Sequence, residues 1–142
     1  MIKKLFLFTL LVSSFLVISC SNEDTTGSTG TETRVGTGID LKYAGEIYEA
    51  LNVQKKNGTV LSVLRITISN DGGYKLFYVE TSDANTYNGE VVPKEIFKVS
   101  DTKYNTEFFG EVTRTFEFAS DGSTLTLHEP NSYNEDIVLT KK

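Results

Sequence analysis

Cys20 and His128 are the only cysteine and the only histidine of the 142-residue chain, so few of its side chains could carry nucleophilic or metal chemistry. A metal site or a Cys–His nucleophile needs such groups side by side. His128 shares a parity with Thr124 and Thr126, which is typical of the polar face of a strand. We therefore expect His128 to be a solvated strand residue, and we predict no catalytic residue, no metal and no cofactor.

Carboxylates are the other groups that could act in acid–base chemistry. Glycosidases need two of them at a set separation, which spacing along a chain does not fix. The candidates are Asp101, Glu107, Glu111 and Glu117. A solvated acidic face is the simpler interpretation of these residues. Residues 83–90, DANTYNGE, begin like a calcium loop, but Tyr87 occupies the third ligand position, so we interpret them as a polar turn.

The residues before Cys20 predict a signal peptide at residues 1–19. Two lysines near the start are followed by an almost wholly apolar run over residues 5–18. As a helix this run would span about 21 Å, against about 30 Å for the hydrocarbon core of a bilayer. It is therefore too short for a comfortable membrane span and suits the apolar core of a signal peptide.

The end of this run, Val17-Ile18-Ser19-Cys20, resembles the lipobox of bacterial lipoproteins. The resemblance implies a diacylglyceryl group on the sulfur of Cys20, cleavage before it and acylation of the new amino terminus. Two or three acyl chains would hold the protein durably on a membrane of the cell envelope. The alternative is a plain signal peptide followed by a free thiol, which is a liability in an exported protein.

Residues 20–38 are expected to form the lipidated cysteine and a flexible tether. Their Ser, Thr, Gly and acidic side chains bury too little apolar surface to fold. The root-mean-square span of residues 21–38 is about 23 Å. Asn22-Glu23-Asp24 resembles the acidic stretch that directs some lipoproteins to the outer face of the outer membrane. We therefore expect a location in the outer membrane, on either its periplasmic or its outer face.

The charge of the chain argues against nucleic acid as a partner. The chain has 14 basic and 19 acidic residues, and loss of Lys3 and Lys4 with the signal peptide leaves 12 against 19, or −7. An acidic surface repels phosphate backbones and anionic lipid headgroups. Residues 39–142 are enough for one domain with one core.

Residues 39–142 carry the pattern of an all-β meander of about seven or eight short strands. Apolar and polar residues alternate over residues 64–69, 115–118 and 124–128, as in half-buried antiparallel strands. Turn signals separate these runs, and Asn57-Gly58 favours a type I′ hairpin. Phe116 and Phe118 should point inward together with Leu125 and Leu127.

Two segments leave room for more than one interpretation. Residues 41–51 have a helical stripe, but Gly45 and the following Asn57-Gly58 favour a strand over about 43–54. Residues 91–99 contain Pro93, which cannot donate to a ladder, so they are expected to form an edge strand or a bulge. Arg114 falls on the apolar parity of its strand, and we expect it at a barrel mouth, pairing with a carboxylate such as Glu111.

The segment RTFEFASDGSTLTLHEP, residues 114–130, resembles the closing hairpin of small bacterial lipocalin-like domains, and KYAGEIYEA, residues 42–50, stands where their opening strand would be. The resemblance implies a small closed barrel, and a β-sandwich is the alternative. The many aromatic residues could fill such a barrel or line a cavity for an apolar ligand. The candidate ligand-binding residues are Tyr74, Tyr78, Tyr104, Phe116 and Phe118.

These patterns favour a membrane-anchored envelope lipoprotein that binds a small apolar ligand or a protein and is not an enzyme. An envelope hydrolase that uses carboxylates and a lipoprotein that inhibits an enzyme are the alternatives.

Overall fold

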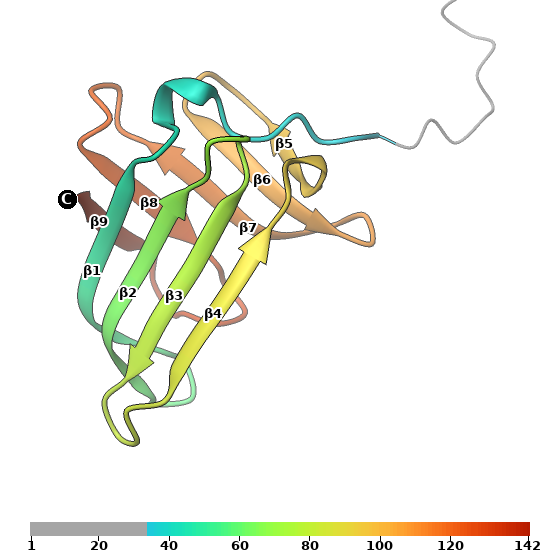
Figure 1. The fold of residues 1–142 in the computed structure, drawn as a ribbon. Coiled ribbons are helices and arrows are strands. Elements are labelled where there is room, and N and C mark those ends of the chain that lie inside the picture. The colour runs from blue at the N-terminus through green and yellow to red at the C-terminus, as the bar shows by residue number, and fades with distance from the viewer. Residues whose placement is uncertain (1–33) are drawn as a thin grey trace, which may run out of the picture. The chain divides into compact units, whose positions relative to one another are not determined.

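The computed structural model describes residues 34–142, so the predicted signal peptide, Cys20 and most of the predicted tether lie outside the described residues. The described residues form one antiparallel sheet of nine strands, which curls into a nearly closed, barrel-like shape (Figure 1). The strand order is β4-β3-β2-β1-β9-β8-β7-β6-β5. The prediction of an all-β antiparallel meander is thus confirmed.

The strands are short and joined mostly by tight turns. They are β1 (Ile47–Gln54), β2 (Val60–Ile68), β3 (Tyr74–Glu80), β4 (Thr86–Val91), β5 (Ile96–Lys98), β6 (Lys103–Phe108), β7 (Glu111–Phe118), β8 (Thr124–His128) and β9 (Ile137–Lys141). Two 3₁₀ turns, η1 (Leu41–Tyr43) and η2 (Pro93–Glu95), precede β1 and β5.

The structure has nine strands where seven or eight were predicted, and residues 91–99, expected as an edge strand or a bulge, contribute to two of them. The chain leaves β4 at Val91, turns through η2 at Pro93 and enters the three-residue strand β5. Strands β4 and β5 are the two edges of the sheet, which fits a proline that cannot donate to a ladder.

Residues 43–54 form a strand, as predicted, but it begins only at Ile47, because η1 and a left-handed Gly45 come first. The helical stripe in this segment does not mark a buried helix face, since Leu41, Ile47 and Leu51 are exposed. In the strand Tyr48 is buried and Ala50 packs against the core. Asn52 has φ 54° and reverses the alternation, so that Val53 is the next buried residue.

The Asn57-Gly58 hairpin differs from the predicted type I′ turn. Only Gly58 has a positive φ, and the hairpin closes through a hydrogen bond of 2.8 Å from the backbone N–H of Lys55 to the carbonyl oxygen of Thr59. The loop is therefore longer than two residues and uses glycine alone for its left-handed position.

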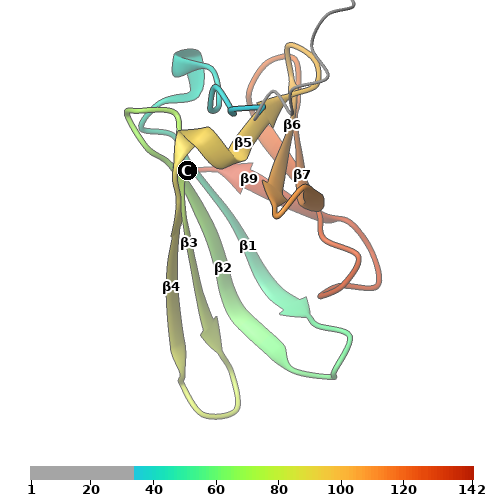
Figure 2. The same ribbon diagram turned by 90° about the vertical axis from the view of Figure 1, so that its right-hand side faces the viewer.

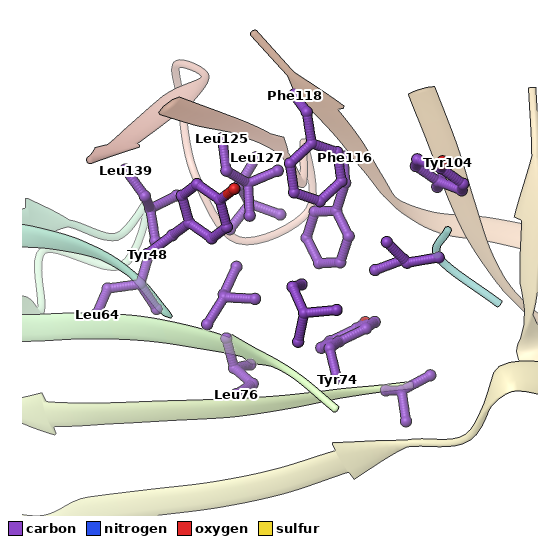
Figure 3. Close-up of a cluster of buried hydrophobic side chains, with 14 of the residues drawn as sticks. Tyr48, Leu64, Tyr74, Leu76, Tyr104, Phe116, Phe118, Leu125, Leu127 and Leu139 are labelled. Carbon is purple, nitrogen blue, oxygen red and sulfur yellow. The ribbon is translucent and has the colours of Figure 1, made fainter. Parts of the chain in front are cut away.

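The core fills the space between the two halves of the curled sheet (Figure 3). The predicted register of the last hairpins is confirmed, since Phe116 lies opposite Leu127 and Phe118 opposite Leu125, all four of them buried. Aromatic rings pack edge to face across the interior, with the Tyr74 and Phe116 centroids 4.7 Å apart. This packing supplies the apolar burial that stabilises a domain in which no tryptophan occurs.

The first described residues are attached to the sheet. The backbone N–H groups of Gly36 and Gly38 donate to the carbonyl oxygens of Lys94 and Ile96, at 2.8 and 3.1 Å. Ile39 continues the contact by donating to Gly72. These residues therefore belong to the folded unit, which begins at Val35 and not at the predicted residue 39.

Within residues 34–142, no helix is long and apolar enough to cross a membrane.

Candidate functional site

Four of the five predicted ligand-binding residues lie together in the core. Tyr74, Tyr104, Phe116 and Phe118 are each at most 2% exposed (Figure 3). Tyr104 and Phe118 meet edge to face with their centroids 5.8 Å apart. Burial raises the pKa of Tyr104 to about 12. These rings fill the interior of the barrel-like sheet, and this is the first of the two interpretations given above for the aromatic residues, filling the barrel or lining a cavity.

The fifth residue, Tyr78, lies on β3 beside the edge strand β4, packs partly against the core and stacks on Tyr87. Their ring centroids are 5.0 Å apart and their planes differ by 15°. The two residues face each other across the β3–β4 ladder. Tyr87 is 45% exposed, so one aromatic face of the pair remains open to solvent.

Gly89 makes room for this stack. A Cβ atom at Gly89 would lie 2.7 Å from the hydroxyl oxygen of Tyr87, so the ring can fold over the strand only where a side chain is absent. The predicted polar turn at residues 83–90 is therefore wrong beyond residue 85, because β4 begins at Thr86. The alternation of Tyr87, Gly89 and Val91 is the signal that could have identified the strand.

A cation covers the other face of Tyr78. The ammonium nitrogen of Lys55 lies 4.1 Å from the centroid of the Tyr78 ring and 3.6 Å from a carboxylate oxygen of Glu80. A lysine over an aromatic face is attracted by the ring quadrupole. Tyr78 is thus contacted on both faces of its ring, by Lys55 and by Tyr87.

Arg114 connects the two halves of the sheet through the interior. Its Nε donates to Glu129 at 2.6 Å, and its Nη1 donates to the Tyr74 hydroxyl at 3.2 Å. Tyr74 also shares a hydrogen bond of 3.1 Å with Thr106. Arg114 is paired with a carboxylate, as predicted, but the partner is Glu129 and not Glu111. Burial alone would lower the pKa of Arg114, and its contacts with Tyr74 and Glu129 outweigh this and raise it.

The loop after β8 completes this polar network. The Ser132 hydroxyl donates to Glu129 at 2.7 Å, and Tyr133 is buried beside it. Burial and the charge of Glu129 raise the pKa of Tyr133 to about 12. The side chains of this network bond to one another, so the network stabilises the packing of the interior.

The groups considered for catalysis or metal binding are dispersed. Asp101 pairs with Lys98 at 3.1 Å, and Glu117 pairs with Lys103 at 3.6 Å. His128 is a solvated strand residue, as predicted, and contacts Asp136. Among residues 34–142, no group of three or more His, Cys, Asp or Glu side chains is placed to hold a metal ion. The exposed features of the site are instead those of a binding surface, an aromatic face beside a strand edge.

No family model matches the chain, and comparisons with curated proteins and with solved structures find no match. No relative therefore assigns a role to these residues.

Proposed function

We propose that the protein is a lipid-anchored protein of the bacterial cell envelope, held through Cys20, whose lipocalin-like β domain binds a partner and does not catalyse a reaction. The lipobox-like sequence before Cys20 supports the anchor. The polar composition of residues 21–33 supports a tether that holds the domain near the membrane.

We propose further that the partner is a protein and that it binds along strand β4. The observation that carries this proposal is the open edge of β4, beside the exposed face of Tyr87. Because the interior is filled by side chains, a protein partner is favoured over a small apolar ligand inside the barrel. An extended segment of the partner would add a strand to the sheet, and one of its side chains would cover Tyr87.

The two sheet edges differ in a way that supports this assignment. Residues 36–38 cover the short edge strand β5 through backbone hydrogen bonds. Strand β4 is six residues long, pairs with β3 without a register shift, and contains neither lysine nor proline. Proteins commonly protect exposed edges with such residues or with bulges, so an unprotected edge is suited to strand pairing.

The register shows which groups of β4 face outward. The backbone N–H of Glu80 donates to the carbonyl oxygen of Asn85, so residues 85, 87, 89 and 91 bond toward β3. The N–H groups of Thr86, Asn88 and Glu90 therefore point to the open edge. A proline at residue 88 would remove an outward donor without breaking the β3–β4 ladder.

This geometry gives a direct test of the binding edge. Solubilised envelope extract is passed over wild-type, Asn88→Pro and Asn88→Ala protein, and retained proteins are compared by mass spectrometry. We expect the same partner on wild-type and Asn88→Ala protein and its loss on Asn88→Pro. Equal retention by all three would contradict binding along β4.

The anchor is tested separately by labelling cells with a radioactive fatty acid. We expect wild-type protein to be labelled and Cys20→Ala protein to remain unlabelled and uncleaved. A Cys20→Ala protein that still takes up label would exclude a lipid on this residue.

A further inference from the structure

The hairpin between β6 and β7 ends in an apolar tip. Phe109 is fully exposed, and Phe108 and Val112 beside it are 36% and 52% exposed. We call these three residues the β6–β7 tip; the hairpin that carries them lies at the end of β6 and β7 (Figures 1 and 2). Large apolar side chains gathered on an exposed projection are a common mark of a surface that meets another apolar phase.

The conformation of Phe109 is a second, independent observation. Phe109 and Gly110 have φ 52° and 80°, which makes the two-residue connection a type I′-like turn. Asparagine, aspartate or glycine is favoured at the first position of such a turn, and a bulky side chain there is strained. Three other turns use glycine at their left-handed position, namely those of Gly58, Gly72 and Gly122. The sequence thus keeps a phenylalanine at the tip despite a conformational cost.

The tip lies on the same side of the folded unit as its first residue. In Figure 1 the first described segment and the β6–β7 hairpin both lie on the right-hand side of the ribbon, the side that faces the viewer in Figure 2. From residue 21 to residue 34 the chain could span about 20 Å as a random coil. A lipid on Cys20 would therefore keep the side that carries the tip within reach of a bilayer.

We propose that the β6–β7 tip inserts into the interface of a zwitterionic lipid bilayer, as a second membrane contact beside the lipid anchor. This inference rests on the proposed anchor. Phenylalanine rings at the headgroup level remove apolar surface from water without spanning the membrane. Because the anchor would supply a high effective concentration of lipid, a weak contact is enough.

Size and charge favour lipid over a protein partner at this position. The tip presents three side chains, far fewer than the roughly 20–30 residues on each side of a standard protein interface. Glu107 and Glu111 flank it, and the mature chain has a net charge of −7. Carboxylates repel anionic headgroups, so the expected surface is zwitterionic, such as phosphatidylcholine.

The absence of tryptophan from the sequence allows a clean optical test. Full-length lipidated protein carrying Phe109→Trp is reconstituted in phosphatidylcholine vesicles that contain brominated lipid, a short-range quencher. The matched control is Leu41→Trp on η1, whose side chain is 67% exposed. We expect quenched, blue-shifted emission from residue 109 and unquenched emission from residue 41. Partial replacement of phosphatidylcholine by phosphatidylglycerol should weaken the quenching.

Acylation is measured on the same samples, so the two proposals fail separately. If the protein is acylated but emission from residue 109 is unquenched, the proposed lipid contact of the tip is wrong and the anchor stands. The same conclusion follows if the emission is blue-shifted without quenching, as it would be in a protein pocket. If the protein is not acylated, the anchor fails, and vesicles are then titrated into the same variant. Quenching in that titration supports the tip, and its absence overturns it.

A second variant guards against a folding artefact. Phe109→Asn suits the turn and leaves the fold intact. In unlipidated protein that begins at Ser21, and so lacks both the signal peptide and Cys20, it should lower the affinity for vesicles at least about tenfold. Tenfold corresponds to 1.4 kcal/mol, and burying a phenylalanine is worth more. Unchanged affinity would contradict insertion of Phe109.

Discussion

At the scale of single residues, the backbone of Phe109 gives the sharpest prediction about stability. Placing a non-glycine residue in the left-handed region destabilises the fold by about 1–2 kcal/mol, and the destabilisation is smaller for asparagine than for a bulky residue. Phe109→Asn should therefore raise the free energy of unfolding by about 1 kcal/mol in urea melts. Phe108→Asn, on the neighbouring strand residue, should give no such gain. Equal or lower stability of Phe109→Asn would show that its conformation is not strained.

Glu49 gives a prediction about acid. Hydrogen bonds from Arg65 at 2.7 Å, and then from Lys142 at 3.0 Å, hold the pKa of this carboxyl below its usual value. The folded state therefore binds fewer protons than the unfolded state at moderately acid pH. The stabilisation from the pair is full above about pH 4.3 and is lost as the pH falls through the lowered pKa of the folded state.

The measurement is the free energy of unfolding between about pH 6 and pH 3. Glu49→Gln should be less stable than wild type near neutrality and should lose less stability on acidification. The control is Glu90→Gln at an exposed carboxylate. If Glu49→Gln follows the wild-type curve, the pair contributes nothing to acid sensitivity.

At the scale of elements, the contact between residues 36–38 and β5 depends on close backbone approach. A Cβ atom at Gly36 would lie 2.4 Å from the carbonyl oxygen of Ile96. Gly36→Ala must therefore displace this segment, and we expect a loss of about 1–3 kcal/mol in denaturant melts. Limited proteolysis should then cut after residue 36, whereas wild-type protein should be protected from about Val35.

Thr37→Ala is the matched control, since Thr37 is exposed in the same segment. It should stay within roughly 0.5 kcal/mol of wild type. Identical melts and digestion patterns for the two variants would show that the segment does not stabilise the sheet.

Elements whose burial alternates could be predicted from the sequence. The inward positions of Ile66, Phe116 and Leu127 follow from period two alone, because a strand of a one-sided core buries every second residue. The reversal at Asn52 could not be predicted with the same ease, since a positive φ is uncommon, and the asparagine, which adopts it more often than most residues, is the one local signal.

The candidate site was harder to predict than the fold. Tyr87 and Gly89 stand in a polar stretch that resembles a turn, and their alternation with Val91 is a weaker signal of a strand than their pairing with Tyr78 and Leu76. Arg114 was expected to find a carboxylate close in sequence, but Glu129 reaches it because the β7–β8 hairpin brings the two residues together. Such partners depend on register between strands, which alternation within one strand does not contain.

At the scale of the whole molecule, buried tyrosines predict alkaline instability. Burial, together with nearby negative charge, raises the pKa of Tyr48, Tyr104 and Tyr133 to about 12. These values lie above the value of about 10 in an unfolded chain. The folded state thus holds protons that the unfolded state loses, and stability should be full below about pH 10 and fall as the pH rises toward 12.

Circular dichroism in urea at several pH values measures this loss. Tyr133→Phe should reduce the alkaline slope, because one of the three groups no longer titrates. A free energy of unfolding that stays constant from about pH 9 to about pH 12 would contradict the burial of neutral phenols as the cause.

The strand order also determines when the molecule can finish folding. Strands β1–β4 form one meander and β5–β9 another, and the two join where β1 meets β9, through Tyr48 opposite Lys141 and Glu49 opposite Thr140. This seam ties the start of the sheet to the last residues of the chain, so its loop-closure entropy and contact order are the highest in the domain. A chain that emerges from a ribosome or an export channel with its N-terminus first cannot close the sheet until β9 has emerged. Until then the first meander must wait with one edge of β1 unpaired.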